Sequence, residues 1–305
     1  MTTVTVLSGG VGGARAARGF DSILGPGDLT VIVNVGDDDR IYGVHVSADL
    51  DTVLYTLADR EGPQGWGLAG DTYTAMERLA AAGEDTSFRL GDIDLALCLE
   101  RTRALDAGEP LSLIVARVAA RLGVNRRVLP ATDGALRTRI ETTSGEWLDF
   151  QEYFVLRGHR DEVASVEYSG AGLTTPAPGV VDAIGSADLL VIAPSNPPLS
   201  VWPILAVPGL RDAVAAAHRV MAISPLFAGV ALKGPAHRVM ASLGLPPGNA
   251  GVLAAYRGLL TDLVIDVGDA ADAAHGGEVA IHVTDTRIHQ RHEAARLASF
   301  IMELI

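Results

Sequence analysis

Cysteine, basic charge and long apolar runs are all scarce in this sequence of 305 residues. Its one cysteine, Cys98, allows no disulfide within the chain, which fits a reducing cytoplasm. Its 24 Lys and Arg residues against 37 Asp and Glu give a formal net charge of −13, which argues against nonspecific binding to nucleic acid or to an anionic membrane. No apolar run reaches the ~18 residues of a membrane span, and no basic, apolar leader opens the chain. We therefore expect a cytoplasmic protein whose ligands are small molecules.

Buried strands that alternate with helices are the main fold signal. Residues 29–34, 188–193, 219–223 and 263–266 are rich in apolar residues over their whole length, as expected of strands covered on both faces. Helical patterns separate most of these strands, which is typical of parallel sheets with crossover helices. Because 48% of the residues are hydrophobic, the chain can bury a large core. We predict an α/β fold with a Rossmann-like, mostly parallel sheet.

Two segments depart from this alternation. Apolar spacing and Gly or Pro punctuation predict helices over residues 73–82, 95–107 and 111–122, with no strand among them. We interpret the region of about 60–125 as a helical insertion in a single domain that spans residues 1–305. Residues 137–142 and 146–150 alternate in polarity on either side of a Thr-Ser-Gly turn, which predicts a small β-hairpin.

Four glycines follow the first apolar run, at Gly9, Gly10, Gly12 and Gly13. A strand, a tight turn and a helix start at this point would let backbone N–H groups approach a phosphate, with Arg15 reaching it from the first helical turn. The pattern is neither of the common phosphate-binding motifs, because Arg15 stands where G-x-G-x-x-G has its last glycine and no Gly-Lys-Ser/Thr follows. The alternative is a glycine-rich turn without a ligand, beside an exposed arginine.

Five carboxylates fall within fifteen positions, at Asp37, Asp38, Asp39, Asp49 and Asp51. Oxygen ligands suit Mg²⁺, which commonly takes one or two carboxylates together with waters and substrate phosphate oxygens. If the chain is extended, residues 49 and 51 share a face. The pattern predicts a magnesium site that includes Asp37 and Asp51. The alternatives are that Asp51 caps the following helix and that Asp38 and Asp39 are solvated turn residues.

Further polar residues follow other predicted strands. Asn34 ends the second strand and is a candidate for bonding a substrate hydroxyl, although a turn there needs no ligand. Ser195 and Asn196 lie in a loop fixed by prolines, which suits the recognition of a base or sugar, with a plain β-turn as the alternative. Lys233 precedes Gly234 and is a candidate phosphate contact or a surface lysine. In open α/β sheets such loops gather at the carboxyl edge of the strands, where ligands bind.

Taken in order, these motifs resemble those of the 2-phospho-L-lactate transferase family of coenzyme F-420 biosynthesis. The resemblance runs from residue 3 to about residue 285. The matching motifs are Ser-Gly-Gly-Val-Gly-Gly-Ala-Arg at 8–15, Asn-Val-Gly-Asp-Asp at 34–38, Asp-Leu-Asp-Thr at 49–52, Gly-Asp at 91–92, Phe-Gln-Glu-Tyr-Phe at 150–154, Pro-Ser-Asn-Pro at 194–197, Pro-Ile-Leu at 203–205 and Lys-Gly-Pro-Ala at 233–236.

The resemblance implies a magnesium-dependent transfer. The donor is a guanosine diphosphate ester of phospholactate or phosphoenolpyruvate, and the acceptor is the ribityl hydroxyl of the deazaflavin Fo. GMP leaves, and the product is F-420-0 or its dehydro form. The resemblance also implies that Asp37 and Asp51 hold Mg²⁺, that the glycines hold donor phosphates, that the 194–197 loop helps to bind guanosine, and that the protein is a homodimer. Asp49 or Asp51 is then available to orient the attacking hydroxyl.

The segment 91–98 departs from the family pattern, because Ile93 and Cys98 stand where the family usually has arginine and histidine. One alternative is therefore a paralogue with a changed donor or acceptor. A second is a non-enzymatic nucleotide-sugar-binding regulator of the same fold, and a third, an NAD-dependent dehydrogenase, is disfavoured by the missing G-x-G-x-x-G. The sequence does not choose between lactate and enolpyruvate, although its bacterial character favours phosphoenolpyruvate.

Overall fold

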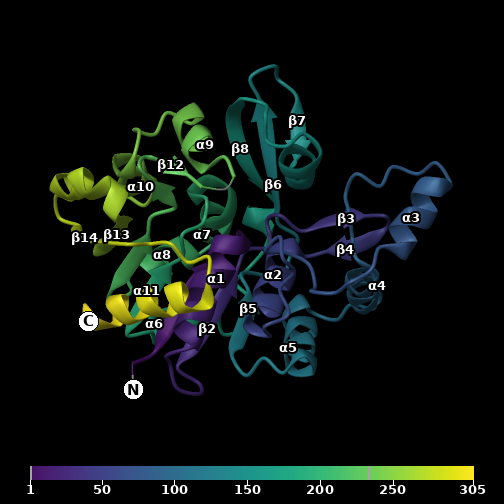
Figure 1. The fold of residues 1–305 in the computed structure, drawn as a ribbon, viewed down its shortest axis with the longest axis horizontal. Coiled ribbons are helices and arrows are strands. Elements are labelled where there is room, and N and C mark those ends of the chain that lie inside the picture. The colour runs from purple at the N-terminus through teal and green to yellow at the C-terminus, as the bar shows by residue number, and fades with distance from the viewer. Residues whose placement is uncertain (1, 233) are drawn as a thin grey trace.

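A seven-stranded parallel sheet forms the centre of the computed structural model, which describes residues 2–232 and 234–305 (Figure 1). The strand order is β14-β13-β10-β9-β1-β2-β5, and every neighbouring pair is parallel. The strands are β1 (Val4–Ser8), β2 (Leu29–Val33), β5 (Arg127–Pro130), β9 (Leu189–Ile192), β10 (Val220–Ile223), β13 (Asp262–Asp266) and β14 (Ala280–Thr284). The predicted α/β fold with a parallel, Rossmann-like sheet is confirmed.

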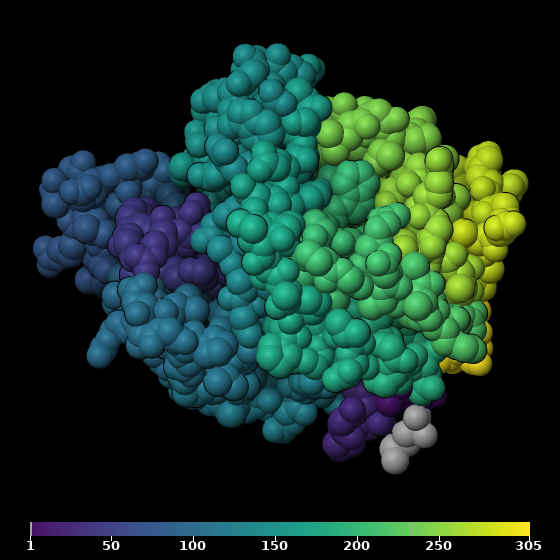
Figure 2. Space-filling model, turned by 180° about the vertical axis from the view of Figure 1, so that it is seen from behind, coloured from purple at the N-terminus to yellow at the C-terminus, as the bar shows by residue number. Residues whose placement is uncertain are grey.

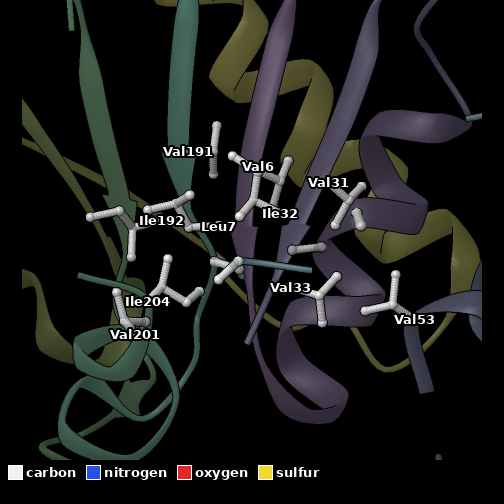
Figure 3. Packing of buried hydrophobic residues seen from close by; sticks show 14 of the residues in the cluster. Val6, Leu7, Val31, Ile32, Val33, Val53, Val191, Ile192, Val201 and Ile204 are labelled. Atoms are coloured by element: carbon white, nitrogen blue, oxygen red, sulfur yellow. The ribbon is translucent and has the colours of Figure 1, made fainter. Parts of the chain in front are cut away.

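The core lies on both faces of the central strands. Every residue of β1, β9 and β10 is buried, as their apolar runs require. Figure 3 shows Leu7 of β1 beside Ile192 of β9, with Ile204 packed below them. Because these strands are covered on both faces, only their ends offer polar groups to a ligand.

Helices cover the sheet in two groups. On one side α1 (Gly10–Asp21) packs between α2 (Ala48–Leu57) and α11 (Arg291–Glu303). The opposite side, which Figure 2 shows from behind, carries α6 (Val180–Gly185), α7 (Trp202–Ala206) and α8 (Leu210–Ala215). The crossover from β10 to β13 holds α9 (Ala236–Ser242) and α10 (Asn249–Ala255), and short 3-10 or π turns complete the chain: η1 (Glu152–Leu156), η2 (Ala171–Leu173), η3 (Pro197–Val201) and η4 (Val267–His275). Among the described residues no helix is long and apolar enough to span a membrane.

The crossover from β2 to β5 contains the predicted helical segment as α3 (Thr74–Ala81), α4 (Asp92–Asp106) and α5 (Leu111–Leu122). Only Met76 of α3 is buried, and this helix projects from the body in Figure 1. Two aspartates join α3 to α4, because Asp92 accepts from the Ala75 backbone N–H (2.9 Å) and Asp71 accepts from that of Ile93 (2.9 Å). The description of the chain as one domain with an insertion stays a prediction.

Small antiparallel elements stand beside the main sheet. The predicted hairpin is β6 (Arg137–Thr142) with β7 (Trp147–Asp149), and β8 (Val163–Ser169) extends it to a three-stranded sheet. Two hairpins were not predicted, β3 (Asp39–Ile41) with β4 (Val44–Val46) and β11 (Leu226–Phe227) with β12 (Val230–Ala231). Their two-residue turns place Tyr42 and Ala228 at positive φ (53° and 50°) before a glycine, where Asn or Asp is the usual signal.

Candidate functional site

The loops that follow β1, β2 and β9 meet at the carboxyl edge of the sheet, as expected. Ser195 Oγ donates to the Gly9 carbonyl (2.7 Å), and the Gly10 N–H donates to Asp49 Oδ1 (2.6 Å). Ser224, which follows β10, does not join these loops, because its Oγ donates to Asn249 Oδ1 of α10 (2.6 Å). A site at this edge is therefore built chiefly from β1, β2, β9 and the start of α2.

Gly10, Gly12 and Gly13 lie at the start of α1, which begins at Gly10, and Gly9 is the N-cap residue before it. A Cβ atom on Gly12 would lie 2.5 Å from the Pro194 carbonyl oxygen, and one on Gly13 would lie 2.4 Å from Ser8 Oγ. These two glycines are thus required for close packing whether or not a ligand binds. The first turn of α1 contains no acidic residue of its own, but Asp49 Oδ1 accepts from the Gly10 N–H and places a carboxylate at this helix N-terminus, so a phosphate here requires a cation that offsets the charge of Asp49. The phosphate contact itself stays a prediction.

Asn34 lies between two carboxylates. Its Nδ2 donates to Asp49 (3.0 Å) and to Asp37 (3.3 Å), and its Oδ1 accepts from the Gly36 N–H (2.8 Å). The side chain is fully buried. Because its donors and its acceptor are already engaged by the protein, Asn34 has the geometry of a residue that holds the carboxylates, and its predicted bond to a substrate hydroxyl stays untested.

Asp37 and Asp49 form a buried pair without a cation. They are 2% and 7% exposed, and no ion pair joins either of them to a basic side chain in the described part of the chain. Burial, followed by the charge of Asp49, raises the pKa of Asp37 well above its ordinary value. Burial raises the pKa of Asp49 to about 6, although bonds from Asn34 and Gly10 favour its charged form. The raised pKa values mean that the pair resists full ionisation without a cation, and two adjacent carboxyl groups of this kind are a donor set that fits Mg²⁺.

Asp51 is held differently. Both of its oxygens accept from Arg101 of α4, with Nη1 3.0 Å from Oδ2, and Arg101 is 2% exposed. Burial alone would lower the pKa of Arg101, but the Asp51 carboxylate raises it above its ordinary value. Asp51 does not cap α2, whose N-cap is Ser47, so that alternative is wrong. Both Asp49 and Asp51 lie inside this helix, where residues two apart point to different sides.

Asp37 and Asp49 thus share Asn34 as a hydrogen-bond partner, whereas Asp51 is bound to Arg101 instead. Among the described residues no group of three or more His, Cys, Asp or Glu side chains is arranged to hold a metal. A magnesium ion needs no such group, since one or two carboxylates with waters and phosphate oxygens suffice. The assignment of Asp37 and Asp51 as metal ligands stays a prediction, and the geometry favours Asp49 as the companion of Asp37.

Two further residues of this edge carry polar contacts that the sequence did not reveal. Asp38 is 2% exposed and accepts from Ser47 Oγ (2.8 Å) and pairs with His45 Nε2 (2.9 Å), so its interpretation as a solvated turn residue is wrong. Gln151 follows β7, and its Nε2 donates to the Asp37 carbonyl (2.8 Å), which connects the small β6-β7-β8 sheet to the loop after β2 that contains Asp37. The Phe-Gln-Glu-Tyr-Phe motif at 150–154 was the available signal for Gln151.

The remaining predicted residues have mixed positions. Arg15 is buried, donates to Glu61 (2.9 Å) and bonds to His289 (3.0 Å), so it is not an exposed arginine. Its phosphate contact stays a prediction. Asn196 Oδ1 accepts weakly from the Leu199 N–H (3.4 Å) at the start of η3, and its buried Nδ2 has no hydrogen-bond partner among residues 2–232 and 234–305. Lys233 lies outside the described residues.

The two departures at 91–98 fall in different surroundings. Ile93 is 57% exposed on the first turn of α4. Cys98 is buried in a small apolar cluster with Val44 and Val46, and burial raises the pKa of its thiol to about 12. The thiol is therefore protonated at neutral pH and unreactive, as its apolar neighbours in the sequence predicted.

A parallel α/β sheet with a glycine-rich first strand-to-helix junction is typical of α/β proteins that bind small ligands at the carboxyl edge of the sheet. Residues 4–297 match the family described as 2-phospho-L-lactate transferase CofD. The chain belongs to this family, and it is accordingly a transferase.

Named relatives cover most of the chain. A phosphoenolpyruvate transferase of Streptomyces griseus is 42% identical over 88% of this chain and 86% of its own length. A 2-phospho-L-lactate transferase of Methanopyrus kandleri is 38% identical over 99% and 97%. A crystal structure of a UPF0052-family protein from Bacillus halodurans has a TM-score of 0.65 and 18% identity over 99% of each chain, which shows the shared fold alone.

Proposed function

We propose that the protein transfers a phosphoenolpyruvyl or 2-phospho-L-lactyl group from its guanosine diphosphate ester to the deazaflavin Fo. The ribityl hydroxyl oxygen of Fo forms a bond to the phosphorus that carries the three-carbon acid. The bond from that phosphorus to the GMP phosphate breaks, GMP leaves, and the hydroxyl proton is released. The product is the phosphodiester F-420-0 or its dehydro form. No covalent enzyme intermediate is required, so positioning and charge neutralisation supply most of the rate.

The observation that carries this proposal is the buried pair Asp37 and Asp49 beside the glycine-rich turn. Asp49 accepts a hydrogen bond from Gly10 in the first turn of α1, where the donor phosphates are expected. We assign Asp37 and Asp49 to hold Mg²⁺, which when bound would neutralise charge on the phosphate oxygens. Of the two carboxylates predicted to orient the attacking hydroxyl, Asp49 is the one in contact with this turn, whereas Asp51 is bound to Arg101.

Phosphoenolpyruvate is the donor acid that we favour. Several bacterial relatives bear the name phosphoenolpyruvate transferase, including those of Streptomyces coelicolor (40% identical) and Mycolicibacterium smegmatis (39%). The archaeal relative is named for 2-phospho-L-lactate and is of similar identity. Identity alone therefore does not separate the two acids, and the donor has to be measured.

The test is a one-pot assay read by mass spectrometry. The protein is mixed with Mg²⁺, Fo, GTP and a matching guanylyltransferase, with phosphoenolpyruvate, phospholactate or 3-phosphoglycerate in separate tubes. We expect an Fo phosphodiester in the phosphoenolpyruvate tube, which would establish the reaction and the acid together. If no tube gives an adduct while a family member run in parallel does, the proposed reaction is wrong. A UDP-sugar that raises the melting temperature would then favour the regulator alternative.

The homodimer implied by the family resemblance is part of the same proposal. We expect a solution mass of twice that of the chain by light scattering coupled to size exclusion. A mass equal to one chain across the accessible concentration range would contradict it. This measurement is independent of the assay, so the oligomeric state and the reaction are tested separately.

A further inference from the structure

Helix α4 of the insertion forms hydrogen bonds with both the backbone N–H and the backbone carbonyl of one residue, His45 of β4. Thr102 Oγ1 accepts from the His45 N–H (2.6 Å), and Arg101 Nη1 donates to the His45 carbonyl (3.3 Å). Thr102 Oγ1 also donates to the Cys98 carbonyl one turn earlier in α4 (2.7 Å), which fixes the direction of its lone pairs. Two consecutive residues of one helix therefore determine where His45 lies.

From His45 the contacts continue to the carboxylates. His45 Nε2 bonds to Asp38 Oδ2 (2.9 Å), and Asp38 is the neighbour of Asp37 in the chain. Arg101 also binds Asp51, which lies two residues after Asp49 in the first turn of α2. The helix thus reaches both segments that supply the Asp37 and Asp49 pair.

These contacts are closed to water. Arg101 and Asp38 are both 2% exposed, and Thr102 is 8% exposed. Four buried carboxylates, at residues 37, 38, 49 and 51, repel one another, and Arg101 is the buried guanidinium bound to one of them. Because hydrogen bonds in a buried setting are lost at high cost, such contacts hold a geometry that exposed ones would not. Partners of this kind, behind the groups that bind a metal, typically tune its affinity.

We propose that Arg101 and Thr102 are positioning residues, which set the Asp37 and Asp49 carboxylates for a divalent cation by holding His45 and Asp51. This rests on the proposed function, in which those two carboxylates hold Mg²⁺. Both side chains are buried and reach the carboxylates through His45 and Asp51, so the insertion contributes to the proposed site through α4.

The experiment measures binding of Mg²⁺ alone, by isothermal titration calorimetry, to the full chain. The informative variant is Thr102→Val, which keeps the shape and removes the hydroxyl that accepts from His45. Thr102→Ser is the conservative variant that restores the hydroxyl, and Arg101→Lys keeps the charge without the two-pronged geometry. Arg103→Met is the matched control, since Arg103 is exposed on the same helix. Thermal unfolding without metal shows that each variant is folded.

We expect Thr102→Val to weaken Mg²⁺ binding about 10–100-fold, the range found when such supporting partners are removed. The Mg²⁺ affinities of Thr102→Ser and Arg103→Met should stay within about twofold of that of the parent chain. In the transfer assay, Thr102→Val should raise KM for the Mg²⁺-bound donor by a larger factor than it lowers kcat. Equal Mg²⁺ affinity in the parent chain and in a folded Thr102→Val would overturn the positioning role and leave the proposed function standing. If the parent chain itself binds no Mg²⁺, both the positioning role and the proposed metal site are wrong. This outcome differs from the previous one because the parent chain, and not only the variant, shows no binding.

Discussion

Two sets of carboxylates lie a few residues apart at the same edge and are stabilised in opposite ways. Asp51 has a buried guanidinium bound to both of its oxygens, whereas Asp37 and Asp49 have each other, Asn34 and a backbone N–H. The first arrangement is electrically complete without a ligand. The second has no cation among the described residues, so the charged forms of Asp37 and Asp49 are disfavoured until a cation binds between them. Charge compensation thus distinguishes Asp51 from the pair to which we assign the metal.

The largest effect is expected from breaking the compensated pair. Asp51→Asn leaves the charge of Arg101 buried without a partner, and we expect the free energy of unfolding to fall by about 3–5 kcal/mol. Chemical denaturation measures this loss. The double variant Asp51→Leu with Arg101→Met removes both charges and should recover most of the stability. If Asp51→Asn is as stable as the parent chain, the pair is not the buried ion pair described above.

The uncompensated pair should respond in the opposite way. We expect Asp49→Asn to lower turnover by about 10²–10³-fold, because charge neutralisation by a bound metal is worth several kcal/mol. The melting temperature should stay the same or rise, since one of two like charges is removed. Assay and thermal unfolding on one preparation give both values. Normal turnover in a folded Asp49→Asn would remove Asp49 from the site.

Asp94 is an intermediate case, because it accepts a hydrogen bond from the Tyr55 hydroxyl but forms no ion pair within the described part of the chain. Burial, and then the charge of Asp51, raises the pKa of Asp94 to about 6 in the folded chain, above the ordinary value of an aspartate. The folded state therefore binds more protons between these values, and Asp94 costs stability as pH rises through that window. Asp94→Asn does not titrate at this position, so its stability relative to the parent chain should rise by about 2–3 kcal/mol between pH 4 and pH 7. A constant difference across pH would contradict the shift.

The smallest effect is expected at an exposed ion pair that joins the β3-β4 hairpin to α4. Arg40 of β3 pairs with Asp106 of α4, and both side chains are more than half exposed. Because solvent screens such pairs, Asp106→Asn should change the free energy of unfolding by less than about 0.5 kcal/mol. Urea denaturation at two salt concentrations measures it. A loss as large as that for Asp51→Asn would show that burial does not separate the two pairs.

Patterns that are local in sequence predicted most of the fold. The apolar runs at β2, β9 and β10 could be recognised because strands covered on both faces need no alternation. The hairpins β3-β4 and β11-β12 could not, since Tyr42 and Ala228 occupy turn positions that usually carry Asn or Asp. Such a turn is stable only because the surroundings hold it, as the Tyr42 hydroxyl shows by donating to the Phe88 carbonyl (2.6 Å).

The candidate site was predictable as a neighbourhood but not as a set of partners. The acidic residues and the glycines follow strand ends, and parallel strands bring their ends together. Which aspartate pairs with Asp37 depended on α2 beginning at Ala48, which turns Asp49 and Asp51 to different sides. Arg101 gave no signal, because an arginine inside a helix is usually exposed and its burial depends on contacts fifty positions away.

The exchanged aspartates at the starts of α3 and α4 have a consequence for how this part of the molecule opens. Asp92 of α4 caps α3 and Asp71, before α3, caps α4, so neither helix can fray from its first turn without releasing the other. Because only Met76 of α3 is buried, the stability of α3 depends on these bonds to α4. Amide hydrogens of α3 should therefore exchange with solvent at the pace of α4 openings, which makes a projecting helix a reporter for the helix that holds the carboxylates.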